Sequence, residues 1–205
     1  DNDPRVAYVE MGLIGEWGEH HDPDISTVFP PHYQPNHVAG RTWIPGIEKV
    51  LGDAFTEAFK NKKVMVRYAY EFTDYEFGNY WDSFAIAEEQ ERGFNAIKKL
   101  GNRWMTQPMG GEITWGWGSL WNKGHRSLED CVNDEETRQL IIDQVRELHT
   151  NHLGGVTWAN FKNNAFLANA GTIQKIMGYH FVLKDFCYPV RVDPGKEAEI
   201  SFKVQ

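Results

Sequence analysis

The alternation of two kinds of apolar pattern constrains the fold of this chain more than any other feature of its sequence. Continuous, partly β-branched apolar runs predict buried strands at 5–12, 63–70, 103–108 and 155–160. Between and after them lie segments with apolar residues at the 3.6-residue spacing of a helix, at 44–58, 83–100, 140–148 and 166–177. A chain that alternates strand and helix in this way forms a parallel sheet covered by helices.

Four strand–helix units make half of a (β/α)8 TIM barrel, and we expect residues 1–180 to form such a half. An open, doubly wound parallel sheet is the alternative, but no glycine-rich phosphate loop follows any predicted strand. The pattern changes after residue 180, where two period-2 stretches flank a turn at 193–197. We therefore expect residues 181–205 to form antiparallel strands that pack beside the barrel and begin a β-sandwich module.

The overall composition narrows the class of ligand. The 205-residue chain has a net charge of −8 and no basic stripe, which argues against nucleic acid as a partner. No apolar run is long enough to span a membrane, and no cofactor motif is present. Eight tryptophans contribute to an aromatic content of 14%, and such a surplus often lines sites for sugars or apolar ligands. We expect a carbohydrate ligand and no cofactor.

Polar side chains gather where the predicted strands end. In a parallel α/β barrel the catalytic groups come from the carboxyl ends of the strands. The residues found there are Glu19 and His20 after the first strand, Arg67 and Tyr68 on the second, Glu112 after the third, and Trp158 and Asn160 on the fourth. Carboxyl groups from different strands suit glycoside hydrolysis, in which one protonates the leaving oxygen and another attacks or activates water.

Glu19 and Glu112 are the two candidate catalytic residues. Glu19 follows Trp17 and Gly18, and the neighbouring ring is expected to desolvate its carboxyl group and raise its pKa, as a general acid requires. Glu112 follows two glycines, which let the backbone turn sharply and aim one side chain, so we expect it to be the nucleophile or second carboxylate. Glu16 is expected to be an exposed loop acid.

Other side chains are expected to bind the carbohydrate rather than to react with it. Trp17 and Trp115 offer aromatic faces on which sugars stack, although the tryptophans of 115–121 can equally form a small core within their own loop. A structural ion pair with Glu71 is the simpler interpretation of Arg67. A metal site at His20 and His21 is a third possibility, but adjacent strand residues point to opposite faces, so we expect no metal there.

Six segments of the chain resemble a known family. In order they are DPRVAYVEMGLIGEWGEHH, VMVRYAY, FGNYWD, PMGGE, LHTNHLGGVTWANF and IMGYHFVLKDFCYPVRVDPGKEAEISFKV. Together they resemble the bacterial domain-of-unknown-function family 4832, a glycoside-hydrolase-like TIM-barrel family, over nearly the whole chain. The WGE and GGE elements are its most specific parts. The chain departs from the family pattern at Glu16, where proline is expected, and near 152–160, where a simpler H-x-x-x-L-N pattern is expected.

The resemblance implies that residues 1–180 are the C-terminal half of a barrel, which contacts a preceding N-terminal half, and that the protein is secreted. It implies Glu19 and Glu112 as the matching acids, with His152 and Asn160 as looser matches. We expect a glycoside hydrolase acting on a polysaccharide or oligosaccharide. The alternative is a non-catalytic carbohydrate-binding barrel, which would be favoured if the two acids lay far apart or if Arg67 held one of them in an ion pair.

Overall fold

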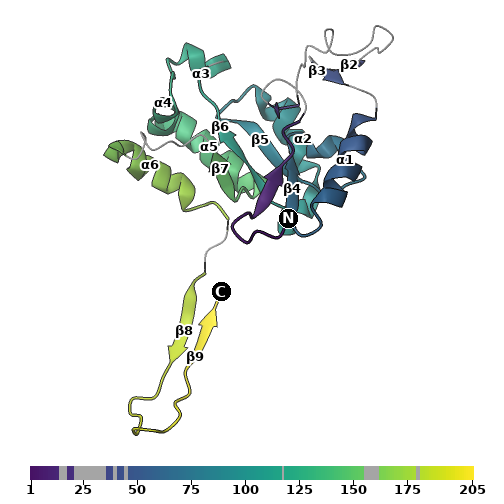
Figure 1. The fold of residues 1–205 in the computed structure, drawn as a ribbon. Helices are drawn as coiled ribbons and strands as arrows, with labels where there is room; N and C mark the ends of the chain where they lie inside the picture. Colours follow the sequence, from purple (N-terminus) through teal and green to yellow (C-terminus); the bar gives the residue numbers. More distant parts are fainter. Residues whose placement is uncertain are drawn as a thin grey trace.

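The computed structural model describes residues 1–13, 18–20, 36–38, 41–43, 46–116, 118–154, 162–178 and 181–205, and for 36–38 and 41–43 it describes the backbone alone. Its centre is one five-stranded sheet in the order β1-β4-β5-β6-β7, in which every neighbouring pair is parallel. These strands are β1 (Tyr8–Glu10), β4 (Lys63–Val66), β5 (Gly78–Phe84), β6 (Met109–Ile113) and β7 (His152–Gly154). The sheet is curled, so this part of the chain is a half-barrel, as the sequence predicts (Figure 1).

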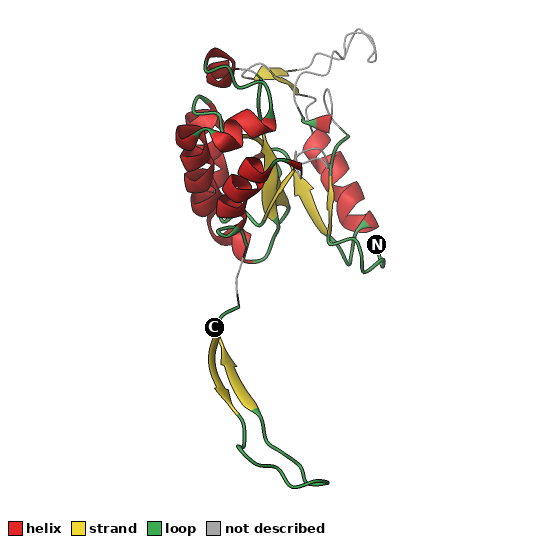
Figure 2. Ribbon diagram, turned by 90° about the vertical axis from the view of Figure 1, so that its left-hand side faces the viewer, coloured by secondary structure: helices red, strands yellow, loops and turns green. Residues whose placement is uncertain are grey.

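Helices lie on either side of the strands in the view of Figure 2. The longer ones are α1 (Ile47–Ala58), α5 (Glu135–Leu148) and α6 (Asn164–Gln174), and each overlaps a helix predicted from apolar spacing. Shorter helical segments are α2 (Asn95–Lys98), which continues a π-helix at Gln90–Phe94, α3 (Gly118–Asn122), α4 (Leu128–Asn133), η3 (Ala69–Glu71) and η5 (Gly101–Met105). A small antiparallel pair, β2 (Asn36–Val38) and β3 (Arg41–Trp43), precedes α1. No helix among the described residues is long and apolar enough to cross a membrane.

Polar side chains fix where two of these helices begin. The Asp134 carboxylate accepts a hydrogen bond of 2.8 Å from the Thr137 N–H at the start of α5, and Asn163 accepts one of 3.1 Å from the Phe166 N–H at the start of α6. Each bond satisfies an N–H that has no partner within the helix. The sequence interpretation began the first helix near Thr42, but Thr42 lies in β3 and α1 begins after Gly46.

The sequence interpretation was wrong at two places in the sheet. It put a strand at 103–108, whereas Gly101–Met105 is a 3-10 helix and the strand follows at Met109–Ile113. It also started a helix at 83 and so missed β5. Both errors have a physical cause in the close approach of β5 and β6. A Cβ on Gly111 would lie 1.7 Å from the Trp81 carbonyl oxygen, so the two glycines belong to a strand rather than to a turn.

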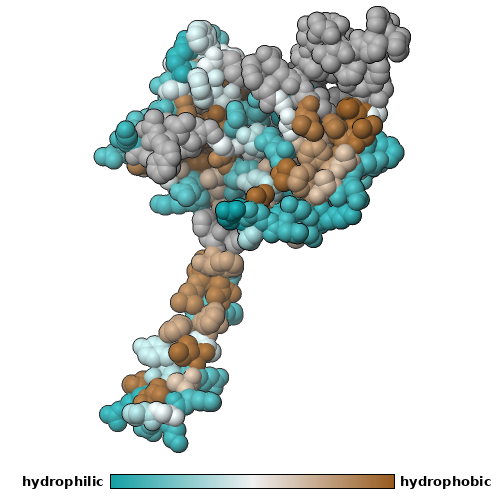
Figure 3. Space-filling model, viewed as in Figure 1, coloured by the Kyte–Doolittle hydropathy of each residue, from teal (hydrophilic) through white to brown (hydrophobic). Residues whose placement is uncertain are grey.

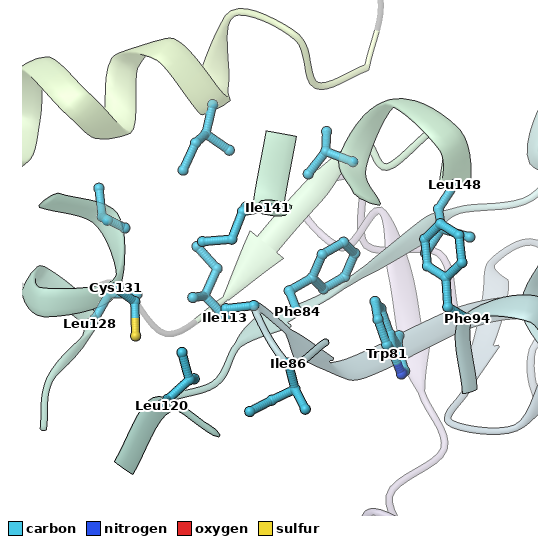
Figure 4. Close-up of a cluster of buried hydrophobic side chains, with 14 of the residues drawn as sticks. Trp81, Phe84, Ile86, Phe94, Ile113, Leu120, Leu128, Cys131, Ile141 and Leu148 are labelled. Carbon is cyan, nitrogen blue, oxygen red and sulfur yellow. The ribbon is translucent and has the colours of Figure 1, made fainter. Parts of the chain in front are cut away.

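The outer face of the sheet and the helices share the hydrophobic core. Its larger part includes Trp81 and Phe84 of β5, Met109 and Ile113 of β6, and side chains of the helices around them, drawn in Figure 4. A second cluster gathers Met11, Val64 and Val66 with aromatic residues of the segment between β4 and β5. Burial of apolar side chains on the outer face leaves the inner face of the curled sheet for other residues.

The last 25 residues leave the half-barrel. The strands β8 (Leu183–Cys187) and β9 (Ser201–Val204) are antiparallel, which confirms the predicted change of pattern. The expectation that they pack beside the barrel is wrong, because every residue from 181 to 205 is exposed and the hairpin projects away from the helices in Figures 1 and 2. Figure 3 shows apolar residues along its length.

Candidate functional site

Strand register places seven polar or aromatic side chains on the inner face of the sheet. On the first three strands, Glu10 is in register with Met65, and Met65 is in register with Gly78. Farther along the sheet, Tyr80 is in register with Gly110, and Gly110 and Glu112 are in register with His152 and Gly154 of β7. Residues in register share a face, and every second residue of a strand returns to that face. The inner side chains are Tyr8, Glu10, Arg67, Tyr80, Asp82, Glu112 and His152. They form two layers, which lie at successive levels along the strands.

The lower layer joins the two edge strands. The Tyr8 ring of β1 lies 4.5 Å from the His152 ring of β7, centroid to centroid, and the Tyr80 ring lies 6.5 Å from it. Gly110 makes room for this contact, because a Cβ there would lie 2.0 Å from the imidazole. Burial lowers the pKa of His152 to about 4. His152 is therefore a neutral imidazole near pH 7, and its Nδ1 lies 2.6 Å from the Asn151 side-chain oxygen.

The upper layer, at the carboxyl ends of the strands, holds the carboxyl groups. The Tyr80 hydroxyl donates a 3.3 Å hydrogen bond to Glu112 Oε2. Burial raises the pKa of Glu112, as does the charge of Asp82, while Tyr80 and Arg67 oppose the increase. Burial also raises the pKa of Glu10, followed by the charges of Glu112, Asp82 and Glu19. Carboxyl groups from β1, β5 and β6 thus act on one another electrostatically.

Arg67 forms an ion pair with Asp82, and the side chains of both residues are only 9% exposed. The sequence interpretation paired Arg67 with Glu71 instead. The Ser83 hydroxyl donates a 2.9 Å hydrogen bond to Asp82, and the guanidinium also lies 4.7 Å from the centre of the Tyr68 ring. Among the described residues, no acceptor meets the buried Arg67 Nε–H. A buried donor without an acceptor is costly, so this N–H is available to an oxygen of a ligand.

The segment that carries Glu19 folds back on the end of β1. Gly18 has a φ of 78°, and a Cβ on it would lie 2.6 Å from the Gly12 carbonyl oxygen. His20 is fully buried, and its Nε2 lies 2.7 Å from the Met11 carbonyl oxygen. His20 therefore fixes the position of this segment, and its part in substrate binding stays a prediction. The backbone brings Glu19 close enough for its charge to act on Glu10.

The structure brings some of the predicted site residues together and leaves others apart. The charges of Glu19 and Glu112 both act on Glu10, and Arg67 forms an ion pair with Asp82. Trp115 lies in the loop after β6 and is 49% exposed. Three predicted residues, Trp17, Trp158 and Asn160, lie outside the described residues, as does His21.

Sequence reasoning missed Glu10, Tyr80 and Asp82. Glu10 ends the apolar run AYVE, where a charged residue marks the carboxyl end of a buried strand. Tyr80 and Asp82 flank Trp81, and this period-2 alternation was the available signal for a strand with one polar face. Within the described part of the chain, no three histidine, cysteine, aspartate or glutamate side chains are grouped to hold a metal ion.

Comparisons with known proteins test whether this chain has recognisable relatives. The resemblance to the domain-of-unknown-function family 4832 stays a prediction. No protein-family model matches the chain, and searches of curated proteins and of solved structures find no match to it either.

Proposed function

We propose that this chain provides the acid–base site of a glycoside hydrolase that acts on a polysaccharide or oligosaccharide. One observation carries the proposal. Carboxyl groups from β1, β5 and β6 come together at the carboxyl end of the inner face, beside buried Arg67, whose Nε–H meets no acceptor among the described residues. This is the end of a parallel barrel at which catalytic groups lie. The raised pKa of Glu112 and the Arg67–Asp82 pair give neighbouring carboxyl groups different environments.

The chemistry requires one protonated and one ionised carboxyl group. The protonated group gives its proton to the glycosidic oxygen as the bond from that oxygen to the anomeric carbon breaks. The ionised group either attacks the anomeric carbon or removes a proton from the water that does so. One water is consumed in either case: its hydroxyl group bonds to the anomeric carbon, and its other proton returns the carboxyl pair to its starting protonation state. Although burial raises the pKa of Glu112, we assign it the ionised role because it accepts the hydrogen bond of the Tyr80 hydroxyl and is influenced by Arg67, both of which favour the charged form.

Aromatic side chains near the carboxyl ends of the strands suit the binding of sugar rings. Trp115 and Trp121, in the segment after β6, are about half exposed. The Arg126 guanidinium lies 3.4 Å from the centre of the Trp121 ring and covers one of its faces, leaving the opposite face for a ligand. We place the protein outside the cell, where polysaccharide substrates occur. The other half of the barrel is expected to complete the cleft over the inner face.

The test is hydrolysis of a broad glycan panel by the full protein, with products identified by chromatography and mass spectrometry. Glu112→Gln keeps the side-chain volume and is expected to reduce turnover at least about 100-fold. The matched control is Glu57→Gln, an exposed residue of α1 that should keep wild-type turnover. Binding of a glycan without cleavage would replace this proposal with the carbohydrate-binding alternative. Cleavage unaffected by Glu112→Gln would remove Glu112 from the mechanism.

A further inference from the structure

In each layer of the inner face, a glycine on one strand is in register with a larger residue on the neighbouring strand. In the lower layer His152 occupies the space above Gly110, its neighbour in register, and reaches Tyr8 on the opposite edge. In the upper layer the glycine is on the other strand, because Glu112 is in register with Gly154. A Cβ on Gly154 would lie 3.3 Å from the Tyr80 hydroxyl and 3.7 Å from the Glu112 Cβ. Gly154 therefore lies close against Tyr80 and Glu112, and a larger residue there would crowd the Tyr80 hydroxyl.

Glu10 is the residue of β1 in this upper layer. It follows Tyr8 by two positions and therefore points to the same face, one step nearer the carboxyl end of the strand. Glu112 follows Gly110 in the same way on β6. Tyr8 contacts His152, and Glu10 and Gly154 follow these two residues by two positions on their own strands. This places Glu10 toward Gly154 and Glu112, and the charge of Glu112 acts on it. Both glutamates belong to strands, which hold reacting groups more firmly than the loop that carries Glu19.

The side chains around Glu10 and those around Glu112 have different effects on ionisation of the carboxyl group. Glu112 accepts the hydrogen bond from Tyr80 and lies near Arg67, and both favour its ionised form. Glu10 faces the charges of Glu112, Asp82 and Glu19, against which only Arg67 acts. Burial and these three carboxylates raise the pKa of Glu10. The hydrogen bond from Tyr80 therefore favours the ionised form of Glu112, whereas the three carboxylates around Glu10 favour its protonated form.

We propose that Glu10 is the proton donor of the site and Glu112 its ionised partner, with Glu19 an adjacent charge rather than a reacting group. The inference rests on the proposed hydrolytic function and assigns the acid of that reaction. Glu10 transfers its proton to the leaving glycosidic oxygen and becomes a carboxylate, while Glu112 supplies the electron pair to the anomeric carbon or to a proton of water. The Arg67 Nε–H, which meets no acceptor in the described part of the chain, offers a hydrogen bond to a sugar hydroxyl.

The first arm of the test follows carboxyl titration by nuclear magnetic resonance in protein labelled with carbon-13 at glutamate. Glu112→Gln removes the largest charge acting on Glu10 and is expected to lower the pKa of Glu10, whereas Glu57→Gln should leave it unchanged. This readout needs no substrate. An unchanged Glu10 titration in Glu112→Gln would overturn the pairing.

The second arm compares Glu10→Gln with Glu19→Gln on a cleaved glycan. Glu10→Gln is expected to lose at least about 100-fold in turnover, and to lose less on an aryl glycoside whose leaving group needs no proton. Glu19→Gln should keep turnover within a few-fold. Loss of its charge lowers the pKa of Glu10, so the alkaline limb of the pH profile should move to lower pH. Collapse of turnover in Glu19→Gln with wild-type turnover in Glu10→Gln would overturn the assignment.

The two arms separate the inference from the proposed function. A wild-type protein that cleaves no glycan, but in which Glu112→Gln moves the titration of Glu10, contradicts the hydrolytic function and supports the carboxyl pair. A protein that cleaves glycans without any coupling between these carboxyl groups supports the function and contradicts the pair.

Discussion

His152 shows how a single side chain can have a role different from the one its position suggests. The resemblance to the domain-of-unknown-function family 4832 implied it as one of the looser matches among the substrate-binding residues. In the structure it fills the floor beneath the carboxyl groups, between Tyr8 and the backbone at Gly110. Its Nε2 is buried, with no hydrogen-bond partner among the described residues. An imidazole in such surroundings supports the site by its shape and by staying neutral.

This burial makes stability depend on pH. The pKa of His152 is about 4 in the folded protein and near 6.5 when the chain is unfolded, so the unfolded chain binds more protons between these values. The contribution of His152 to stability is therefore present above pH 6.5 and is lost as the pH falls toward 4. His152→Phe keeps a ring beside Tyr8 and should remove this part of the dependence. Denaturant unfolding of both proteins from pH 4 to 7 measures it, and identical slopes would contradict the prediction.

At the scale of elements, sequence reasoning was accurate where one face of an element alone is apolar and regular. The helical spacing of Leu140, Ile141, Val145 and Leu148 predicted the later turns of α5, and the run KKVMV predicted β4. It failed at β5 and β6, where glycines and polar side chains lie inside strands. A glycine in these strands makes room for a side chain of the neighbouring strand, as Gly110 does for His152. No pattern within a single strand shows this requirement.

The site was predictable to a similar extent. In a barrel the catalytic groups lie at the carboxyl ends of the strands, and this rule identified Glu112, Arg67 and the segment of Glu19. Glu10 and Asp82 could not be ranked from the sequence, because their importance depends on register between strands far apart in the chain. The burial of His20 could not be predicted either, since a buried histidine and a ligand-binding one look alike in a glycine-rich loop.

Gly110 provides a test at the level of strand pairing. Gly110→Ala places a methyl group where the His152 ring lies, and we expect it to destabilise the protein by about 1–3 kcal/mol as the ring is displaced. Gly171→Ala in α6 is the matched control. A Cβ there meets nothing within 4 Å, and alanine in a helix should stabilise by about 0.4–1 kcal/mol. Urea unfolding compares the two variants, and equal effects would contradict the layered packing.

The whole molecule has two parts of different character. Residues 181–205 contain four basic and four acidic side chains, so the net charge of −8 belongs entirely to the preceding part. In the hairpin, Phe186 pairs with Phe202 and Leu183 with Val204, and the register shift between these pairs keeps all four on one face. Each is at least 42% exposed. A two-stranded hairpin is marginal by itself, and this face suits a second sheet, as in the expected β-sandwich.

The exposed hairpin face should govern how the chain behaves in solution. Apolar patches of this kind promote association, and a hairpin without net charge offers little repulsion against it. We expect concentration-dependent self-association of the chain, and its reduction in the double variant Phe186→Ser, Phe202→Ser. Light scattering across a concentration series measures this, with urea unfolding as the control for an intact half-barrel. A chain that stays monomeric at every concentration would contradict the prediction.

The contact between Tyr8 and His152 has a consequence for how the site is made. These two rings come from the first and last strands of the sheet, so the segment between them must cross the fold four times before they meet. Parallel strands joined over such distances pair slowly, because loop closure precedes the contacts that reward it. Tyr8 belongs to β1 and can make this contact only after β7 has been synthesised. The contact between the two edge strands is therefore expected to be among the last features to form as the protein folds.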